Sequence, residues 1–169
     1  CTNVDFNSTL PIKLNYKTPE TLGSDRIALA VGSLQYAGNK LIIDLGTCIT
    51  YDLVVGDQYI GGQISLGVKM RLDALHQNTA NLPKLDFVNS DNFIGNSTNE
   101  SILVGVCDSL YFEIKSVIEK YQSRYPNIIT ILTGCDSEII QEKLPNINFI
   151  NPYLLMEGLN YIIATHEKT

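Results

Sequence analysis

The sequence has few of the residues that bind transition metals or cross-link small secreted domains. It contains four cysteines, none of them in a C-x-x-C pair, and its histidines are His76 and His166. Structural zinc sites need about four such ligands at short spacings, so a zinc site is disfavoured. Widely spaced cysteines are typical of reduced thiols, and we therefore expect a cytoplasmic protein.

Long apolar runs are also missing. No stretch approaches the roughly 20 residues that a membrane-spanning helix needs, so no membrane partner is expected. The first ten residues, CTNVDFNSTL, lack the basic region and apolar stretch of a signal peptide. The chain starts with Cys1 and its opening reads like the middle of a domain, so we expect that N-terminal sequence precedes it.

Basic residues are outnumbered by acidic ones, which gives a formal net charge of −6. An acidic balance argues against a nucleic-acid partner. The composition, 44% hydrophobic and 18% charged over 169 residues, is otherwise that of a globular protein. This length fits one domain or two small lobes.

The first half of the chain shows a helix followed by closely spaced strands. Apolar residues at helical spacing predict a helix that starts at Ser24 or Asp25 and stops at Gly38. Residues 40–45, 50–55 and 58–64 read as strands, with a turn at Gly56-Asp57. Helical spacing returns over residues 68–79.

The second half reads mainly as helix. Ser97 and Glu100 form an S-x-x-E capping box that opens the longest helix, which ends near Tyr125. Strands are expected at residues 128–134 and 148–151, and helices at 137–144 and 154–168. The order predicts an α/β protein with a three-strand antiparallel meander and further strands packed by helices. That is the ribonuclease-H-like arrangement of actin-like ATPases and sugar kinases.

The first candidate site is Gly23-Ser24-Asp25-Arg26 at a helix N-terminus. First-turn amides and the helix dipole favour an anion there, and Arg26 could hold a carboxylate or phosphate in bidentate fashion. Asp25 could act as a general base toward a hydroxyl. Because Ser and Asp are also favoured N-cap residues, these residues could serve as a simple helix cap with a solvated arginine.

The second candidate site lies in residues 41–52, where an apolar strand runs into an acid and a turn. Gly46 would let the backbone approach phosphate oxygens, Thr47 could donate a hydroxyl and an amide, and Asp44 offers a hard oxygen to a cation. An ordinary strand-to-hairpin turn is the alternative. It leaves unexplained why a costly charge stands in an Ile-Ile-Asp-Leu run.

A third set of weaker signals is spread along the chain. Paired glycines within the strand, Gly61 and Gly62, usually mark a bulge or a close approach. The others are residues 79–83 (TANLP) and 95–98 (GNST). By itself Thr98 reads as the first residue of the capped helix.

Together these segments resemble the type III pantothenate kinases of the acetate-kinase, sugar-kinase, Hsp70 and actin superfamily. The resemblance rests on YKTPETLGSDR (16–26), IDLGTCITYD (43–52), GGQISLG (61–67), TANLP (79–83), GNSTNE (95–100), the TG turn at 133–134 and LLMEGL (154–159). It covers about residues 9–163. The combination is far more specific than any single glycine motif.

The resemblance implies ATP-dependent phosphorylation of pantothenate, the first step of coenzyme A biosynthesis. It makes Asp25 the proton acceptor and Asp44 the ligand of a monovalent cation, potassium or ammonium. Gly46 and Thr47 would contact ATP, which the kinases use with Mg2+. The pantothenate site would be lined by Tyr16, Gly23, Ser24, Asp25, Arg26 and Thr98.

The resemblance also implies a homodimer with pantothenate bound near its interface. Residues 1–38 would be the end of an N-terminal lobe that carries the substrate loop and a helix. Residues 39–169 would be the C-terminal ribonuclease-H-like lobe. The long helix after Ser97 is a candidate dimer element, although it could equally be a core helix.

The chain departs from the family pattern in several places. Family members carry a first D-x-G-N-T phosphate loop in an N-terminal lobe, and this sequence has no such motif. We therefore expect this polypeptide alone to bind ATP poorly and to turn over little. Leu66 replaces a proline, Cys48 an alanine and Cys135 the second glycine of T-G-G. The last change would matter if that glycine needs a positive φ.

Two other functions are compatible with the fold. One is a non-catalytic actin-like-fold protein that acts as a regulatory or accessory factor. Such a protein has no need for a base, so the joint presence of Asp25, Arg26, Asp44 and Thr47 favours the enzyme. The other is a different kinase or phosphatase of the superfamily, which would not keep the YKTPETLGSDR segment.

Overall fold

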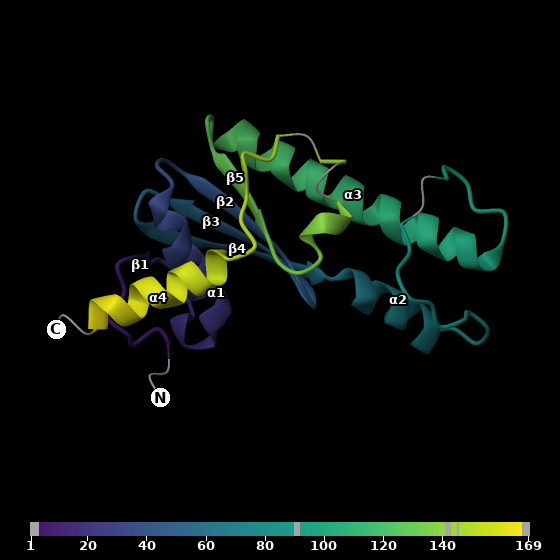
Figure 1. The fold of residues 1–169 in the computed structure, drawn as a ribbon, viewed down its shortest axis with the longest axis horizontal. Coiled ribbons are helices and arrows are strands. Elements are labelled where there is room, and N and C mark those ends of the chain that lie inside the picture. Colours follow the sequence, from purple (N-terminus) through teal and green to yellow (C-terminus); the bar gives the residue numbers. More distant parts are fainter. Residues whose placement is uncertain (1–3, 90–91, 141–142, 145, 167–169) are drawn as a thin grey trace.

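The computed structural model describes residues 4–89, 92–140, 143–144 and 146–166 (Figure 1). The helices and strands follow the order β1 (Lys13–Leu14), α1 (Ser24–Gly32), β2 (Lys40–Leu45), β3 (Cys48–Val55), β4 (Gln58–Leu66), α2 (Val68–Gln77), α3 (Thr98–Arg124), β5 (Ile129–Thr133), β6 (Phe149–Ile150) and α4 (Leu154–His166).

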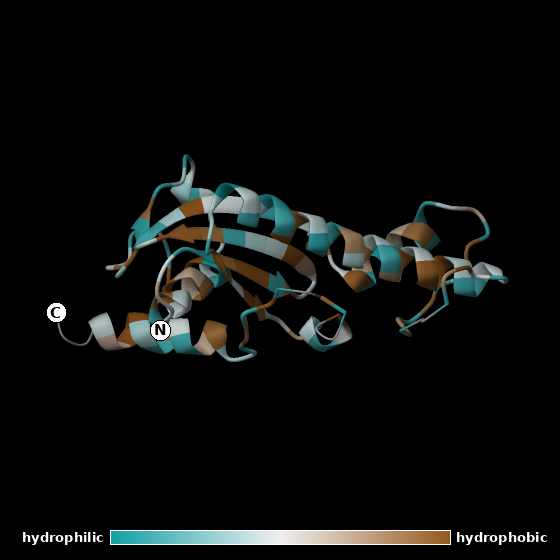
Figure 2. Cartoon of the chain, turned by 90° about the horizontal axis from the view of Figure 1, so that it is seen from above, coloured by the Kyte–Doolittle hydropathy of each residue, from teal (hydrophilic) through white to brown (hydrophobic). Residues whose placement is uncertain are grey.

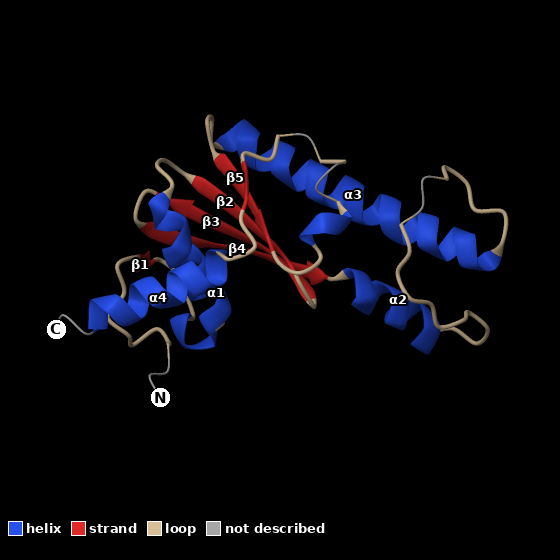
Figure 3. Cartoon of the chain, in the orientation of Figure 1, coloured by secondary structure: helices blue, strands red, loops and turns tan. Residues whose placement is uncertain are grey.

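The strands form one six-stranded sheet in the order β1-β4-β3-β2-β5-β6 (Figure 3). Strands β2, β3 and β4 are consecutive and antiparallel, which confirms the predicted meander. Strand β5 then joins β2 in parallel, and β6 joins β5 in parallel. A three-strand meander with parallel strands added next to its first strand, β2, is the ribonuclease-H-like fold of actin-like ATPases, as the sequence predicted.

A hydrophobic layer covers each face of the sheet, and the central strands are therefore buried on both faces. Leu41 and Ile43 of β2 face α2 and α3, whereas Ile42 faces α1 and α4. Side chains alternate along a strand, so a continuous apolar run supplies both cores. Hydrophobic residues accordingly concentrate in the strands (Figure 2).

Helix α3 extends well beyond the sheet with its N-terminal end alongside α2 (Figure 1). Its start confirms the capping signal, since the Ser97 hydroxyl accepts a hydrogen bond from the Glu100 amide at 3.3 Å. The Glu100 carboxylate accepts one from the Asn96 amide at 2.9 Å, one residue earlier than in an ideal capping box. Farther along α3, Glu113 accepts hydrogen bonds from Tyr51 of β3 and Arg71 of α2.

Helices α1 and α4 cross on the other face at very close range. A Cβ on Gly158 of α4 would lie 1.8 Å from the Ala28 carbonyl oxygen, and one on Gly32 of α1 would lie 2.4 Å from the Leu154 carbonyl oxygen. Only glycine permits this approach of the two backbones. The pair holds α1 against the sheet, and α1 carries the first candidate site.

Some sequence-based boundaries were wrong. Helix α1 ends at Gly32 and continues only as a 3-10 turn, Ser33–Gln35, because the Ser33 hydroxyl bonds back to the Ala30 carbonyl at 2.7 Å. The predicted helix at residues 137–144 is a 3-10 turn, Ser137–Ile139, and its positions 141–142 lie outside the described residues. Strand β1 was not predicted, since two residues are too few for an alternation to register.

The predicted division at residue 38 stays a prediction. Strand β1 extends the same sheet by pairing with β4, and α1 packs on α4. None of the helices in the described part of the chain has the length and apolarity that crossing a bilayer requires.

Gly158→Ala tests the contact between α1 and α4. The added methyl group must push the two backbones apart, so we expect a loss of about 1–3 kcal/mol or more in the free energy of unfolding. Urea denaturation measures it. Gly105→Ala is the matched control, because no atom outside its own stretch of helix lies within 4 Å of its Cβ position in α3. Its free energy of unfolding should rise by about 0.5–1 kcal/mol, because alanine favours a helix more than glycine does. Equal stability of the two variants would contradict this account of the packing.

Candidate active site

A buried ion pair joins the start of α1 to the middle of the sheet. The Arg26 guanidinium donates to Asp52 Oδ1 from Nε at 2.9 Å and from Nη2 at 2.6 Å. The side chain of Arg26 is 7% exposed and that of Asp52 is 0% exposed. Burial lowers the pKa of Arg26, but the hydrogen bond and charge of Asp52 raise it above its ordinary value. The guanidinium therefore keeps its charge.

Asp52 has further donors on its own strand, β3, and on the neighbouring strand β4. The Tyr59 hydroxyl donates to Oδ1 at 2.7 Å, and the Thr50 hydroxyl donates to Oδ2 at 3.1 Å. Burial raises the pKa of Asp52 above its ordinary value, although the bonds from Arg26, Tyr59 and Thr50 oppose that rise. This set of donors is what a buried carboxylate needs to remain ionised.

Tyr16 joins this network through an aromatic contact. Its ring meets the Tyr59 ring edge-on, with centroids 5.8 Å apart and planes at 61°. Two glycines of β4 lie against these groups, and a Cβ on Gly62 would lie 1.7 Å from the Tyr51 carbonyl oxygen. A Cβ on Gly61 would lie 3.5 Å from the Tyr16 ring, and one on Gly62 would lie 3.1 Å from Arg26 Nη2. The register of β4 also shifts here, so the predicted bulge or close approach at these glycines is confirmed.

Asp44 lies near the end of β2, on the sheet face toward α1. Burial raises the pKa of Asp44 from 3.8 to about 6, and the negative charges of Asp25 and Asp52 act in the same direction. Three carboxylates thus interact at one place, whereas a single arginine lies among them and pairs with Asp52. The surplus of negative charge gives a potential that attracts a cation.

Asp25 is exposed in the first turn of α1. Its Oδ1 accepts the backbone amide of Arg26 at 2.9 Å. Gly23 precedes the helix as its N-cap, and a Cβ there would lie 2.3 Å from Asp25 Oδ1. The N-cap is therefore Gly23, which has no side-chain cap, and Asp25 satisfies one amide from within the first turn. The alternative of a simple cap with a solvated arginine is wrong, because Arg26 is buried in its ion pair with Asp52. An exposed carboxylate beside Asp44 also fits a base that meets a ligand from solvent.

The turn after β2 meets two other glycine segments. The Gly67 amide donates to the Thr47 carbonyl at 3.2 Å, and a Cβ on Gly67 would lie 2.3 Å from that oxygen. Gly134 has φ +95°, and its Cβ would lie 2.5 Å from Asp44 Oδ1. Cys135 does not have a positive φ, so the sequence change there causes no strain. Gly46, Thr47, Gly67 and Gly134 thus form a rim of close-packed backbone beside Asp44.

Thr98 lies apart from these residues within the chain. It begins α3 at the end that extends beyond the sheet, whereas Asp25 belongs to α1 on the opposite face (Figure 1). Thr98 lines an apolar groove between α2 and α3, together with Leu75, Leu82 and Ile102. Its role as a substrate contact stays a prediction.

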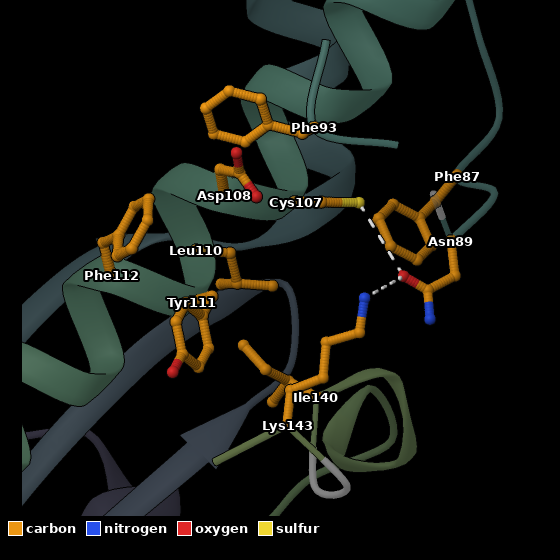
Figure 4. A pocket seen from close by; sticks show the side chains of 10 residues that line it. All are labelled: Phe87, Asn89, Phe93, Cys107, Asp108, Leu110, Tyr111, Phe112, Ile140 and Lys143. Carbon is orange, nitrogen blue, oxygen red and sulfur yellow. Dashed lines mark hydrogen bonds between the residues drawn. The ribbon is translucent and has the colours of Figure 1, made fainter. Parts of the chain in front are cut away.

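A further pocket of about 450 Å³ lies between α3 and the loops near residues 87 and 140, and none of the predicted site residues lines it (Figure 4). The side chains of Cys107 and Lys143 both point to the Asn89 side-chain oxygen, at 4.0 and 3.3 Å. The aromatic side chains around them include Phe87 and Tyr111.

The sequence reasoning missed Tyr59 as part of the site, and it included Thr50 and Asp52 in the second candidate site without giving either of them a role. Asp52 did carry a signal, because it is an acid inside the strand run ITYDLVV. Such an acid must be paired or neutral when buried. Its partner could not be identified from the sequence, since Arg26 lies 26 positions away in a helix.

Among the residues that the structure describes, no group of three or more His, Cys, Asp or Glu side chains is arranged to hold a metal ion. Asp44 fits a single carboxylate ligand of a weakly held cation, because it is half-buried and faces the charges of Asp25 and Asp52. Backbone carbonyl oxygens near the rim, such as that of Leu45, would have to complete such a site.

Residues 3–120 match the family model described as type III pantothenate kinase. The type III pantothenate kinase of Christiangramia forsetii is 47% identical over 161 residues, covering 94% of this chain and 66% of that protein. That of Flavobacterium psychrophilum is 44% identical over 160 residues, covering 93% and 66%. The chain therefore spans about two thirds of the length of these relatives.

The solved structures that resemble the chain support the fold alone. A Campylobacter jejuni protein assigned to the Baf family of transcriptional activators superposes with a TM-score of 0.68 at 20% identity, covering 94% of this chain and 70% of that one. An Alp12 filament structure gives 0.55 at 17% identity, covering 82% and 53%.

The sheet order defines a protein of the actin-like ATPase fold class. Within that class, the matched family model and the curated relatives identify the family of the chain. The chain belongs to the type III pantothenate kinase family.

Asp44→Asn tests the electrostatics of the site through stability. An acid whose pKa is raised on folding penalises the folded state once it ionises, so the penalty grows between about pH 4 and pH 6 and stays constant above. Asn carries no charge, so the variant should be more stable than wild type at pH 8 and gain nothing at pH 4. The rise in the pKa of Asp44 limits the gain in the free energy of unfolding to about 3 kcal/mol, and solvent screening reduces it further.

Thermal unfolding at both pH values measures this difference. Asp86→Asn, in an exposed loop position, is the control and should show no such pH dependence. A loss of stability in Asp44→Asn at pH 8 would contradict the crowding of negative charge around Asp44.

Proposed function

We propose that the protein to which this chain belongs transfers the γ-phosphoryl group of ATP to pantothenate, with Asp25 as the general base. The product is 4'-phosphopantothenate, and the reaction is the first step of coenzyme A biosynthesis. Family membership supports the reaction. The proposed residue roles rest on one observation, which is that Asp25, Arg26 and Asp44 lie around the buried Asp52.

The reaction requires a hydroxyl nucleophile to be aligned and deprotonated. The primary alcohol oxygen of pantothenate would attack the γ-phosphorus as its proton passes to the Asp25 carboxylate, and ADP would leave. Asp25 suits this role because it is exposed and its Oδ1 is already oriented by the Arg26 amide. Phosphoryl transfer depends mainly on such positioning and on charge neutralisation.

The remaining substrate contacts follow from the same arrangement. Tyr16, Gly23, Ser24 and Arg26 would bind pantothenate. The Nε–Nη2 edge of the Arg26 guanidinium is engaged by Asp52, so this side chain would offer its remaining nitrogen rather than the bidentate grip expected from the sequence.

The nucleotide would meet the rim beside Asp44. Gly46 and Thr47 would contact the phosphates of ATP, which would bind with Mg2+. Asp44 would hold potassium or ammonium, because a monovalent cation relieves the repulsion among Asp25, Asp44 and Asp52. The cation supplies positive charge near the transferring phosphoryl group.

We propose a homodimer on the basis of where Thr98 lies. Thr98 and Asp25 lie on opposite sides of the sheet, so Thr98 could touch the same pantothenate only from a second copy of the chain. The exposed apolar groove between α2 and α3 is a suitable contact surface. A cytoplasmic location and weak ATP binding by this chain alone stay predictions.

Asp25→Asn tests the proposal in the complete gene product with ATP, pantothenate and potassium. Removal of a general base should lower turnover by about 10²–10⁴-fold and leave ATP binding near that of wild type. Product formation and nucleotide binding are measured in parallel. Exchange of potassium for sodium in the same assay should slow the reaction if Asp44 holds the cation.

Glu119→Gln, on an exposed face of α3, is the matched control and should keep wild-type turnover. Wild-type turnover in Asp25→Asn would show that another group is the base. The alternative, a non-catalytic regulatory or accessory protein, predicts no pantothenate-dependent use of ATP by the wild-type product.

A further inference from the structure

We propose that Asp52 is a positioning residue for the reaction, which holds both ends of the substrate loop, residues 16–26, through Arg26 and Tyr59. The proposal rests on the function proposed above, because the loop carries the expected pantothenate contacts and the base. Asp52 would touch neither substrate, since its side chain is 0% exposed.

The first connection runs to the end of the loop. Asp52 Oδ1 accepts two hydrogen bonds from Arg26, whose amide in turn donates to Asp25 Oδ1. The ion pair therefore anchors to strand β3 the residue whose backbone amide orients Asp25. The geometry makes Asp52 the fixed point against which Asp25 is oriented.

The second connection runs to the start of the loop. The same oxygen of Asp52 accepts the Tyr59 hydroxyl at 2.7 Å, and the Tyr59 ring supports the edge of Tyr16. The Arg26 guanidinium also lies 5.9 Å from the Tyr59 ring centroid. A single oxygen of Asp52 thus accepts hydrogen bonds from Arg26, at the end of the substrate loop, and from Tyr59, which packs against its start.

Asp52 also determines which acid Arg26 neutralises. Within the described residues, the ion pair of Arg26 is made with Asp52 and not with Asp25 or Asp44. A guanidinium paired with Asp25 would stabilise its ionised form and make it a weaker base. Removal of the Asp52 charge would leave Arg26 free to turn toward these neighbours.

The competing interpretation is that the pair serves stability alone. A buried ion pair is a poor stabilising device, because desolvation of the two charges offsets their attraction, and apolar side chains of equal volume often do as well. A role in orientation accounts for its place under the loop. The two interpretations predict different kinetics, because a purely structural role changes the amount of folded enzyme and not its affinity for one substrate.

Asp52→Asn in the complete gene product separates them. We expect the KM for pantothenate to rise and kcat to fall, so that kcat/KM for pantothenate drops about a hundredfold, as misplacement by about 1 Å can cause. The KM for ATP should change less than about twofold, since the nucleotide rim is not held by Asp52. Ile131→Val, in the same hydrophobic layer, is the control for a mild loss of stability and should leave both KM values unchanged.

Tyr59→Phe is a second variant that keeps the ring and the Arg26–Asp52 pair and removes one donor. It should raise the KM for pantothenate severalfold, and it decides the question if Asp52→Asn fails to fold. Unchanged KM values for pantothenate in the folded variants, or equal changes for both substrates, would overturn the proposal.

Hydrogen exchange of the backbone amides in residues 16–26 makes the test independent of activity. Exchange should be faster in Asp52→Asn than in Ile131→Val, and equal exchange would overturn the positioning role. If wild type does not phosphorylate pantothenate, the proposed function fails, whereas the exchange result still decides whether Asp52 orders the loop.

Discussion

A buried ion pair between Arg26 of α1 and Asp52 of β3 is the contact on which the site depends. Removal of one partner from such a pair costs about 3–5 kcal/mol, because the other charge stays buried without compensation. The fold provides for this pair in several places. Gly62 lets the backbone of β4 pack closely beside the guanidinium, Tyr59 and Thr50 donate hydrogen bonds to the carboxylate, and α4 packs closely on α1.

The same arrangement explains why the neighbouring acids are available for chemistry. Because Arg26 is committed to Asp52, the charges of Asp25 and Asp44 are left without an arginine of their own among the described residues. Burial raises the pKa of Asp44, and the negative charges of Asp25 and Asp52 raise it further. A site of this kind favours ligands that bring positive charge, and the nucleotide's metal ion or a monovalent cation would do so.

Much of the fold could be predicted from the sequence, since β2 and β3 are short apolar runs bounded by turn residues and Ser97 caps α3 in the predicted way. Asp44 was selected as a candidate from local pattern, because an acid at the end of an apolar strand is unusual. Asp52 could not be assigned a role in this way, since its partner comes from a distant helix. Nor could the place of Thr98, which depends on how far α3 extends past the sheet.

The structure of the complete gene product with pantothenate and a non-hydrolysable ATP analogue tests the central claim most directly. The account predicts the primary hydroxyl of pantothenate within hydrogen-bonding distance of the Asp25 carboxylate. It also predicts that Arg26 remains paired with Asp52 beneath the ligand. A pantothenate bound away from Asp25, or an Arg26 that leaves Asp52 to bind the ligand, would contradict it.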